Sequence, residues 1–230
     1  MDIAVVCVGD ELLSGDTVNT NAAWLGERLT ERGASVERTT VVPDRIADIA
    51  RVVNEYRAEY DAVITTGGLG PTHDDMTMEG VATAFGRDVE TNEAALEWLD
   101  GEGGYHAADL ATGTADLPAG AEPLHNTEGV APGCVVENVY VLPGVPAEMK
   151  AMFEAIEDEF EGERRHTTEV VVDEPESALV ERFAELQERF GVKVGSYPGE
   201  FVRVKIESTD EAAVSAAAAW LRERADAVEA

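Results

Sequence analysis

Strand-like apolar segments that alternate with helix-like segments most constrain how this chain can fold. Residues 3–8 (IAVVCV) and 62–66 (AVITT) are apolar on both faces, which is typical of strands buried in a parallel sheet. Residues 35–42 (SVERTTVV) form a further strand-like segment between them. The intervening segments, 19–33 and 45–56, place apolar residues at helical spacing. The alternation predicts an α/β domain built on parallel strands.

The middle of the chain has a weaker pattern. Residues 101–133 are rich in Gly, Ala, Thr and Pro, and we expect a long loop there with at most one short helix. Residues 134–144 (CVVENVYVLPG) are expected to form two short strands or a hairpin, and a helix follows them.

A smaller unit is expected from residue 163 onward. Its segments follow the order strand, helix, strand, strand, helix, with the last helix over residues 210–228. Val202, Val204 and Ile206 alternate with charged residues, which indicates a sheet with one solvent-facing side. We therefore expect a main domain at 1–162 and a small α+β domain at 163–230.

The charge of the chain is extreme, with 47 acidic and 17 basic residues and a formal net charge of -30. Such a surface repels nucleic acid, which is bound mainly by Lys and Arg, so we expect no nucleic-acid partner. The acids are spread along the whole sequence, whereas a face for a basic partner would concentrate them. The spread favours a halophilic protein that stays soluble in high salt.

Membrane and secreted classes are not expected. No apolar run approaches the roughly 20 residues that span a bilayer, and the N-terminus lacks the basic start of a signal peptide. Cys7 and Cys134 lie in strand-like apolar runs, where we expect buried free thiols rather than a disulfide or a catalytic thiol. We predict a cytoplasmic protein.

Acidic turns follow each of the predicted parallel strands. Residues 9–15 (GDELLSG), 41–44 (VVPD) and 67–75 (GGLGPTHDD) come after the first, second and third strands. Ligands bind at the carboxyl ends of such strands, so we expect these turns to lie side by side. The glycines of the third turn allow a phosphate close to the backbone. Since phosphate and carboxylates repel each other, the combination predicts a bridging divalent ion, most simply Mg²⁺.

Simpler interpretations of the same residues stay open. The glycines can form a plain structural turn, and Asp44 and Asp75 can cap the helices that follow them. Asn19 and Asn21 either cap the first helix or reach into the cleft. His73 is either a general acid or base or an exposed loop residue.

Several segments together resemble a known family. Residues 9–29, 39–49, 65–77 (TTGGLGPTHDDMT), 126–133 (NTEGVAPG) and 142–154 (LPGVPAEMKAMFE) are similar in order and spacing to the competence/damage-inducible CinA family. They match its N-terminal molybdopterin-binding, MoaB/MogA-like domain, and the likeness is weaker beyond residue 165. The resemblance implies a three-layer α/β/α domain with a mixed, mostly parallel sheet.

The resemblance also implies an activity. CinA-like domains are associated with metal-dependent hydrolysis of ADP-ribose to AMP and ribose 5-phosphate, with Mg²⁺, Mn²⁺ or Co²⁺ as candidate metals. Leu69 stands where the related adenylyltransferases carry threonine, which argues against pterin adenylylation. The alternative is a module that binds molybdopterin or a nucleotide without turnover, which the absence of Lys and Arg from 88 to 149 favours.

The expected site combines the residue-based and the family-based assignments. The resemblance also implies a homo-oligomer, a dimer or trimer. Many members carry a further C-terminal amidohydrolase domain, and here we expect the stand-alone form without it. We expect Asp44 and Asp75 to be catalytic, and Asp10, Asp44 and Asp75 to hold the metal. A small phosphate-bearing ligand is expected to contact Gly9, Asn19, Asn21, Gly67, Gly68, Gly70, Thr72, Gly144 and Pro146.

Overall fold

The computed structural model describes residues 1–70, 72, 74–105, 110–163 and 165–228. The chain divides into two compact units, Met1–Gly162 and Glu163–Ala230, and each has a hydrophobic core of its own. Within the described ranges, none of the helices combines the length and apolar character that a membrane crossing requires.

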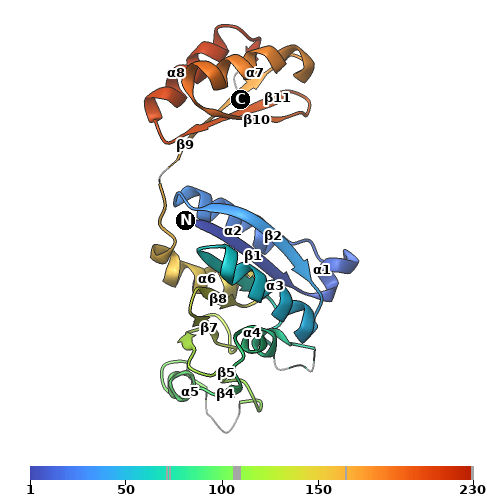
Figure 1. Ribbon diagram of the computed structural model, residues 1–230, viewed down its shortest axis with the longest axis vertical. Coiled ribbons are helices and arrows are strands. Elements are labelled where there is room, and N and C mark those ends of the chain that lie inside the picture. The colour runs from blue at the N-terminus through green and yellow to red at the C-terminus, as the bar shows by residue number, and fades with distance from the viewer. Residues whose placement is uncertain (71, 73, 106–109, 164, 229–230) are drawn as a thin grey trace. The chain divides into compact units, whose positions relative to one another are not determined.

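A six-stranded sheet forms the centre of the first unit, in the order β2-β1-β3-β8-β7-β6 (Figure 1). The four strands β2, β1, β3 and β8 run parallel, whereas β7 and β6 are antiparallel to their neighbours. The predicted mixed, mostly parallel sheet is therefore confirmed. The strands are β1 Asp2–Val8, β2 Ser35–Val42, β3 Ala62–Thr66, β6 Glu122–Leu124, β7 Gly133–Val136 and β8 Val139–Leu142.

Helices cover both faces of this sheet and complete the predicted three layers (Figure 1). Side chains alternate along β1, so Ile3, Val5 and Cys7 pack with α2 and α6. The intervening residues of β1 face the other way, toward α3 and α4. Cys7 and Cys134 are buried free thiols, as expected. The helices are α1 Asp10–Ser14, α2 Thr20–Glu31, α3 Ile46–Glu59, α4 Thr77–Phe85, α5 Glu93–Asp100 and α6 Pro146–Ile156, followed by a 3-10 turn at Glu157–Glu159.

The prediction of a long loop over residues 101–133 is wrong in part. Strand β5 (Asp116–Pro118) pairs with β4 (Val89–Thr91) in a separate two-stranded sheet, and β6 extends the main sheet. Strands of three residues are too short to show a period of two, so their pairing is decided by the neighbouring strand rather than by local pattern. The expected hairpin at 134–144 is confirmed as the antiparallel pair β7 and β8.

The second unit is a four-stranded antiparallel sheet with two helices on one face. Its strand order is β10-β11-β9-β12. Val202, Val204 and Ile206 are buried against the helices, while Arg203 on the other side is exposed, as the alternation predicted. Strand β12 was expected to be helix, but α8 ends earlier and the chain pairs with β9. The elements are β9 His166–Val172, α7 Glu176–Phe190, β10 Lys193–Tyr197, β11 Val202–Ser208, α8 Glu211–Arg222 and β12 Ala227–Val228.

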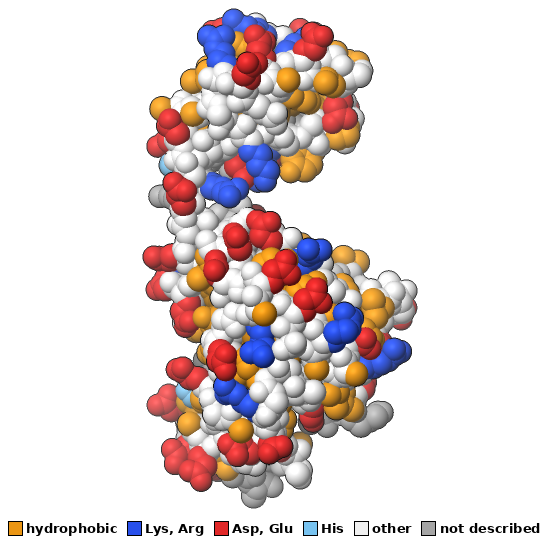
Figure 2. Space-filling model, in the orientation of Figure 1, with side chains coloured by type: hydrophobic (Ala, Val, Ile, Leu, Met, Phe, Trp, Pro, Cys, Tyr) orange, Lys and Arg blue, Asp and Glu red, His pale blue; other side chains and the backbone are white. Residues whose placement is uncertain are grey.

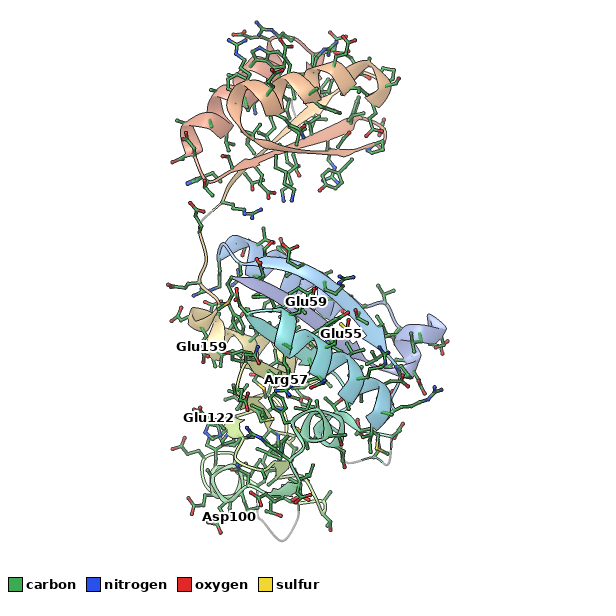
Figure 3. The ribbon with its side chains drawn as sticks, viewed as in Figure 1. Glu55, Arg57, Glu59, Asp100, Glu122 and Glu159 are labelled. Carbon is green, nitrogen blue, oxygen red and sulfur yellow. The ribbon has the colours of Figure 1, made fainter. Side chains whose placement is uncertain are left out.

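Acidic side chains are scattered over the visible surface of both units rather than gathered in one patch (Figure 2). The labelled acids in Figure 3 come from four different elements: Glu55 and Glu59 from α3, Asp100 from α5, Glu122 from β6, and Glu159 from the 3-10 turn. Basic side chains among these acids contact nearby residues. The Arg57 guanidinium, for example, lies 4.3 Å from the ring centre of Phe85 and 4.0 Å from Glu137.

One acidic side chain of the second unit is buried and is expected to stabilise it. Glu207 is 8% exposed and forms salt bridges to Arg165 and Lys205, both at 3.1 Å. Burial by itself would raise the pKa of Glu207, but the hydrogen bonds from Lys205 and Arg165 outweigh it, and the pKa is lowered. We expect Glu207→Gln to destabilise the unit by about 1–3 kcal/mol at neutral pH.

The pH dependence of this effect has a defined sign. A lowered pKa means that the folded state binds the proton more weakly, so the stability from Glu207 is present at neutral pH. It is lost as the pH falls through the lowered pKa. Urea unfolding at neutral and strongly acidic pH should show the two proteins converging in acid. The control is Glu169→Gln, an exposed acid 3.8 Å from Arg203, for which we expect a change near zero.

Candidate functional site

A cleft of about 610 Å³ opens where the parallel strands of the first unit end. Five acidic side chains line it, and no Lys, Arg or His does so among the described residues. The described residues of this cleft therefore do not bind an anion through basic side chains. The acids are Glu11, Asp44, Asp74, Asp75 and Glu148. Most of the expected contact residues also line the cleft, namely Gly9, Asn19, Asn21, Gly67, Gly68, Gly70, Gly144 and Pro146.

Close backbone packing explains the glycines at the base of the cleft. Gly67 has a φ of +100°, and a Cβ atom there would overlap the carbonyl oxygen of Val8. A Cβ on Gly144 would lie 3.1 Å from the Cα of Gly67. The ends of β1, β3 and β8 thus meet at one point. Thr77, at the start of α4, donates its hydroxyl to the Gly67 carbonyl oxygen at 2.8 Å and anchors the loop.

Asp44 faces the glycine loop instead of capping a helix. Helix α3 begins at Ile46, and its N-cap residue, Arg45, makes no side-chain hydrogen bond. The capping alternative for Asp44 is therefore wrong. Its Oδ2 accepts a hydrogen bond from the backbone N–H of Asp10 at 2.8 Å. The other oxygen faces Gly68, since a Cβ built there would lie 3.4 Å from Oδ1.

The electrostatic environment of Asp44 is unfavourable for its negative charge. Burial raises the pKa of the carboxyl, and the neighbouring carboxylates of Asp10, Glu11 and Asp75 add to the rise. The hydrogen bond from the Asp10 amide acts in the opposite direction without cancelling them. A cation between these acids would relieve the repulsion.

Asp75 is also not a helix cap. The N-cap of α4 is Met76, which makes no side-chain hydrogen bond. Instead, Oδ2 of Asp75 accepts hydrogen bonds from the backbone N–H of Thr72, at 3.0 Å, and from the Thr72 hydroxyl. Thr72 was expected to contact phosphate, but it does not line this cleft and orients Asp75. The two bonds use Oδ2, so Oδ1 is the oxygen of Asp75 that they do not engage.

The remaining expected residues have different positions. Asp10 is an exposed residue in the first turn of α1, outside the cleft lining, and supplies its backbone amide to Asp44. Asn19 caps α2, because its Oδ1 accepts from Ala22 N at 3.0 Å, as expected. Asn21 donates from Nδ2 to the Gly144 carbonyl oxygen at 2.8 Å. His73 lies outside the described residues.

The sequence analysis did not single out Asn126 and Glu148, of which Glu148 lines the cleft. Asn126, only 2% exposed, donates from Nδ2 to Glu148 Oε2 at 2.7 Å and to the Ala131 carbonyl oxygen at 2.9 Å. These two hydrogen bonds of Asn126 hold the segment 126–131 against α6. Both residues lie in segments that carried the family resemblance, NTEGVAPG and LPGVPAEM, but nothing local to either segment shows that they pair.

A second cleft of about 530 Å³ lies on the other side of the glycine loop. Both clefts are lined by Gly68–Gly70, Asp75, Val130 and Ala131. Pro132 lines the second cleft only. The further lining of the second cleft is mixed: apolar side chains such as Met78, Tyr105 and Leu110 lie beside Glu79, Asp116 and several threonines. An apolar group can therefore be placed next to the acidic cleft.

The residues present fit a weakly held hard cation rather than a complete protein metal cage. Within the described ranges, no three His, Cys, Asp or Glu side chains converge as a full ligand set. Mg²⁺ is commonly bound by one or two carboxylates, with waters and ligand phosphate oxygens completing its shell. Asp44 and Asp75 supply such carboxylates at the base of the cleft.

Removing the Asp44 charge is expected to stabilise the metal-free protein. Asp44→Asn keeps an oxygen for the Asp10 amide but removes repulsion among neighbouring acids, so we expect a gain of about 0.5–2 kcal/mol. Urea unfolding with a chelator measures it. The control is Asp88→Asn, an exposed acid outside the cleft. Added Mg²⁺ or Mn²⁺ should raise the Tm of the wild type but not of Asp44→Asn. Equal shifts in both would contradict the metal assignment.

Comparison with known proteins matches each unit to a family model. Residues 4–161 match the family described as "Probable molybdopterin binding domain", and residues 164–229 match "FAD synthase, middle domain". A protein of Archaeoglobus fulgidus is 39% identical over 219 residues, which cover 94% of this chain and 95% of that protein.

Relatives that carry the CinA name match the first unit. The structure of a CinA protein of unknown function from Thermoplasma acidophilum is 41% identical, with a TM-score of 0.64, and the match covers 69% of this chain and 97% of that one. A CinA-like protein of Frankia casuarinae is 44% identical over 167 residues, 67% of this chain and 39% of that protein. By sequence and by fold, this chain belongs to the family of probable molybdopterin binding domains and is CinA-like within it.

Proposed function

We propose that the acidic cleft hydrolyses the diphosphate bond of a nucleoside-diphosphate sugar, with ADP-ribose as the first candidate and a divalent metal ion as cofactor. One observation carries the proposal: five carboxylates and a glycine loop share a cleft that no described basic side chain lines. Diphosphate can bind beside those acids only with a cation, and a cation on a diphosphate favours its hydrolysis.

In this proposal, some residues would hold the ligand or the metal, and others would orient the acids. The glycine loop would bring the diphosphate close to the backbone at Gly67 and Gly68, whose positive φ values other residues rarely adopt. Asp44 and Asp75 would hold the metal, which supplies Lewis-acid stabilisation of the charge on the leaving oxygen. Thr72 fixes the rotamer of Asp75. Addition of water across the bridging P–O bond would give AMP and ribose 5-phosphate.

The size of the site agrees with such a ligand. A cleft of about 610 Å³ with a neighbouring, partly apolar cleft of about 530 Å³ is in the range that holds ligands of nucleotide size. Leu69, which lines both clefts, stands where the adenylyltransferases of the family resemblance carry threonine. This difference favours hydrolysis over pterin adenylylation.

The test is a product assay with purified protein in high salt. ADP-ribose is added with Mg²⁺, Mn²⁺ or Co²⁺, and AMP is measured by chromatography. Formation of AMP that a chelator abolishes supports the proposal. Tight binding of ADP-ribose or molybdopterin without product under any metal would leave a binding module instead. Light scattering of the same preparation measures whether the protein is the dimer or trimer that we propose.

A further inference from the structure

Asn21 carries a buried polar atom that has no partner in the protein. The side chain is 8% exposed, and it lines the acidic cleft from the first turn of α2. Its Oδ1 is buried without a hydrogen bond. A buried acceptor left unpaired is unfavourable, and in a cleft it points to a group that a ligand brings.

The orientation of the Asn21 amide is determined by its neighbour. Nδ2 donates to the carbonyl oxygen of Gly144 at 2.8 Å. The reverse orientation would set Oδ1 against that carbonyl oxygen, two acceptors in contact. The group that Asn21 offers to the cleft is therefore an acceptor, and its partner is an O–H or N–H donor or a bound cation.

This chemistry disagrees with a phosphate contact at Oδ1 of Asn21, although the second N–H of Nδ2 could still donate to one. An ionised phosphate or diphosphate presents acceptor oxygens only, so it cannot satisfy Oδ1. A sugar hydroxyl can. The position also fits a sugar, because Asn21 lies next to the glycine loop. It is hydrogen-bonded to Gly144, and Gly144 packs so closely against Gly67 that a Cβ on it would lie 3.1 Å from the Gly67 Cα. In a sugar phosphate, the hydroxyls lie only a few bonds from the phosphorus.

We propose that Oδ1 of Asn21 accepts a hydrogen bond from a ribose hydroxyl of the ligand, so that the cleft selects ribose phosphates over their deoxy analogues. The inference rests on the proposed function for the class of ligand. It assigns Asn21 a role in specificity rather than in phosphate binding. An analogue without that hydroxyl leaves the buried acceptor unpaired, and its affinity should fall about 10–100-fold.

The experiment compares matched ligands by calorimetry in high salt, with and without Mg²⁺. The ligands are AMP, 2′-deoxy-AMP and 3′-deoxy-AMP, together with ribose 5-phosphate and 2-deoxyribose 5-phosphate. On the wild type, one deoxy analogue should bind about 10–100-fold more weakly than its parent. On Asn21→Ala, parent and analogue should bind alike. The control is Asn54→Ala, which removes an exposed asparagine of α3 outside the cleft lining, and it should keep the wild-type ratio.

The outcomes separate this inference from the proposed function. Equal binding of all parents and analogues to the wild type overturns the inference, whether or not AMP is formed from ADP-ribose. An unchanged ratio in Asn21→Ala, with weaker Mn²⁺ binding measured by the metal alone, overturns it in favour of a metal ligand. Selection against a deoxy analogue without any turnover supports the inference and removes the hydrolase. If Asn21→Ala does not fold, the wild-type ligand series decides.

Discussion

Asp75→Asn is expected to lower the rate of metal-dependent ADP-ribose hydrolysis by more than about 100-fold while the protein stays folded. The change keeps the shape of the side chain and an oxygen for the Thr72 amide, but it removes the charge that would hold the cation. Product formation at saturating metal, together with circular dichroism of the variant, measures both parts of the expectation.

Thr72→Val provides a graded comparison for this result. It removes the hydroxyl that donates to Asp75 but leaves the carboxylate in place, so we expect a smaller loss of about 10–100-fold. Asp88→Asn, an exposed acid outside the cleft, should keep full activity. Full activity in Asp75→Asn would show that the acids of the cleft do not serve catalysis.

Gly67→Ala is expected to reduce the stability of the first unit by about 3 kcal/mol or more. A φ of +100° is strained for any residue with a Cβ, at roughly 1–2 kcal/mol. The added Cβ would also overlap the backbone oxygen of Val8, inside a sheet that cannot shift freely, which adds about 1–3 kcal/mol. Urea unfolding followed by tryptophan fluorescence measures the loss.

Gly15→Ala is the matched control, because Gly15 has a similar φ of +82° but no atom within 4 Å of an added Cβ. It should show the conformational strain alone, about 1–2 kcal/mol. Both variants are best compared in a Trp220→Phe background, so that fluorescence reports Trp24 and Trp98 of the first unit. Equal losses would mean that the close approach of Gly67 to Val8 is not a constraint.

The strands and helices of the core were predictable because their residues follow local rules. Segment 3–8 is apolar on both faces since helices cover both faces of the sheet, and Leu25 and Leu29 fall on one side of α2 by helical spacing. The strands β4 to β6 and β12 were not predictable. They span two to three residues each, and only pairing with a distant neighbour makes them strands.

The candidate site divides in the same way. That Asp44 and Asp75 share one cleft followed from the rule that parallel strands present their carboxyl ends at one edge. That neither residue caps a helix, and that the amide and hydroxyl of Thr72 donate to Asp75, required coordinates. Capping and cleft-lining both call for a carboxylate just before a helix, so the sequence is the same in either case.

By itself, then, the sequence determined the longer strands and helices, that the sheet is largely parallel, and that Asp44 and Asp75 meet at its edge. These follow from hydrophobic period and from topology, which are properties of order along the chain. Only the tertiary structure decided the partner of each polar atom. In the folded chain, Nδ2 of Asn21 donates to Gly144, while Oδ1 has no partner in the protein. The sequence does not reveal such partners, because a hydrogen bond depends on ångström distances between residues far apart in the chain.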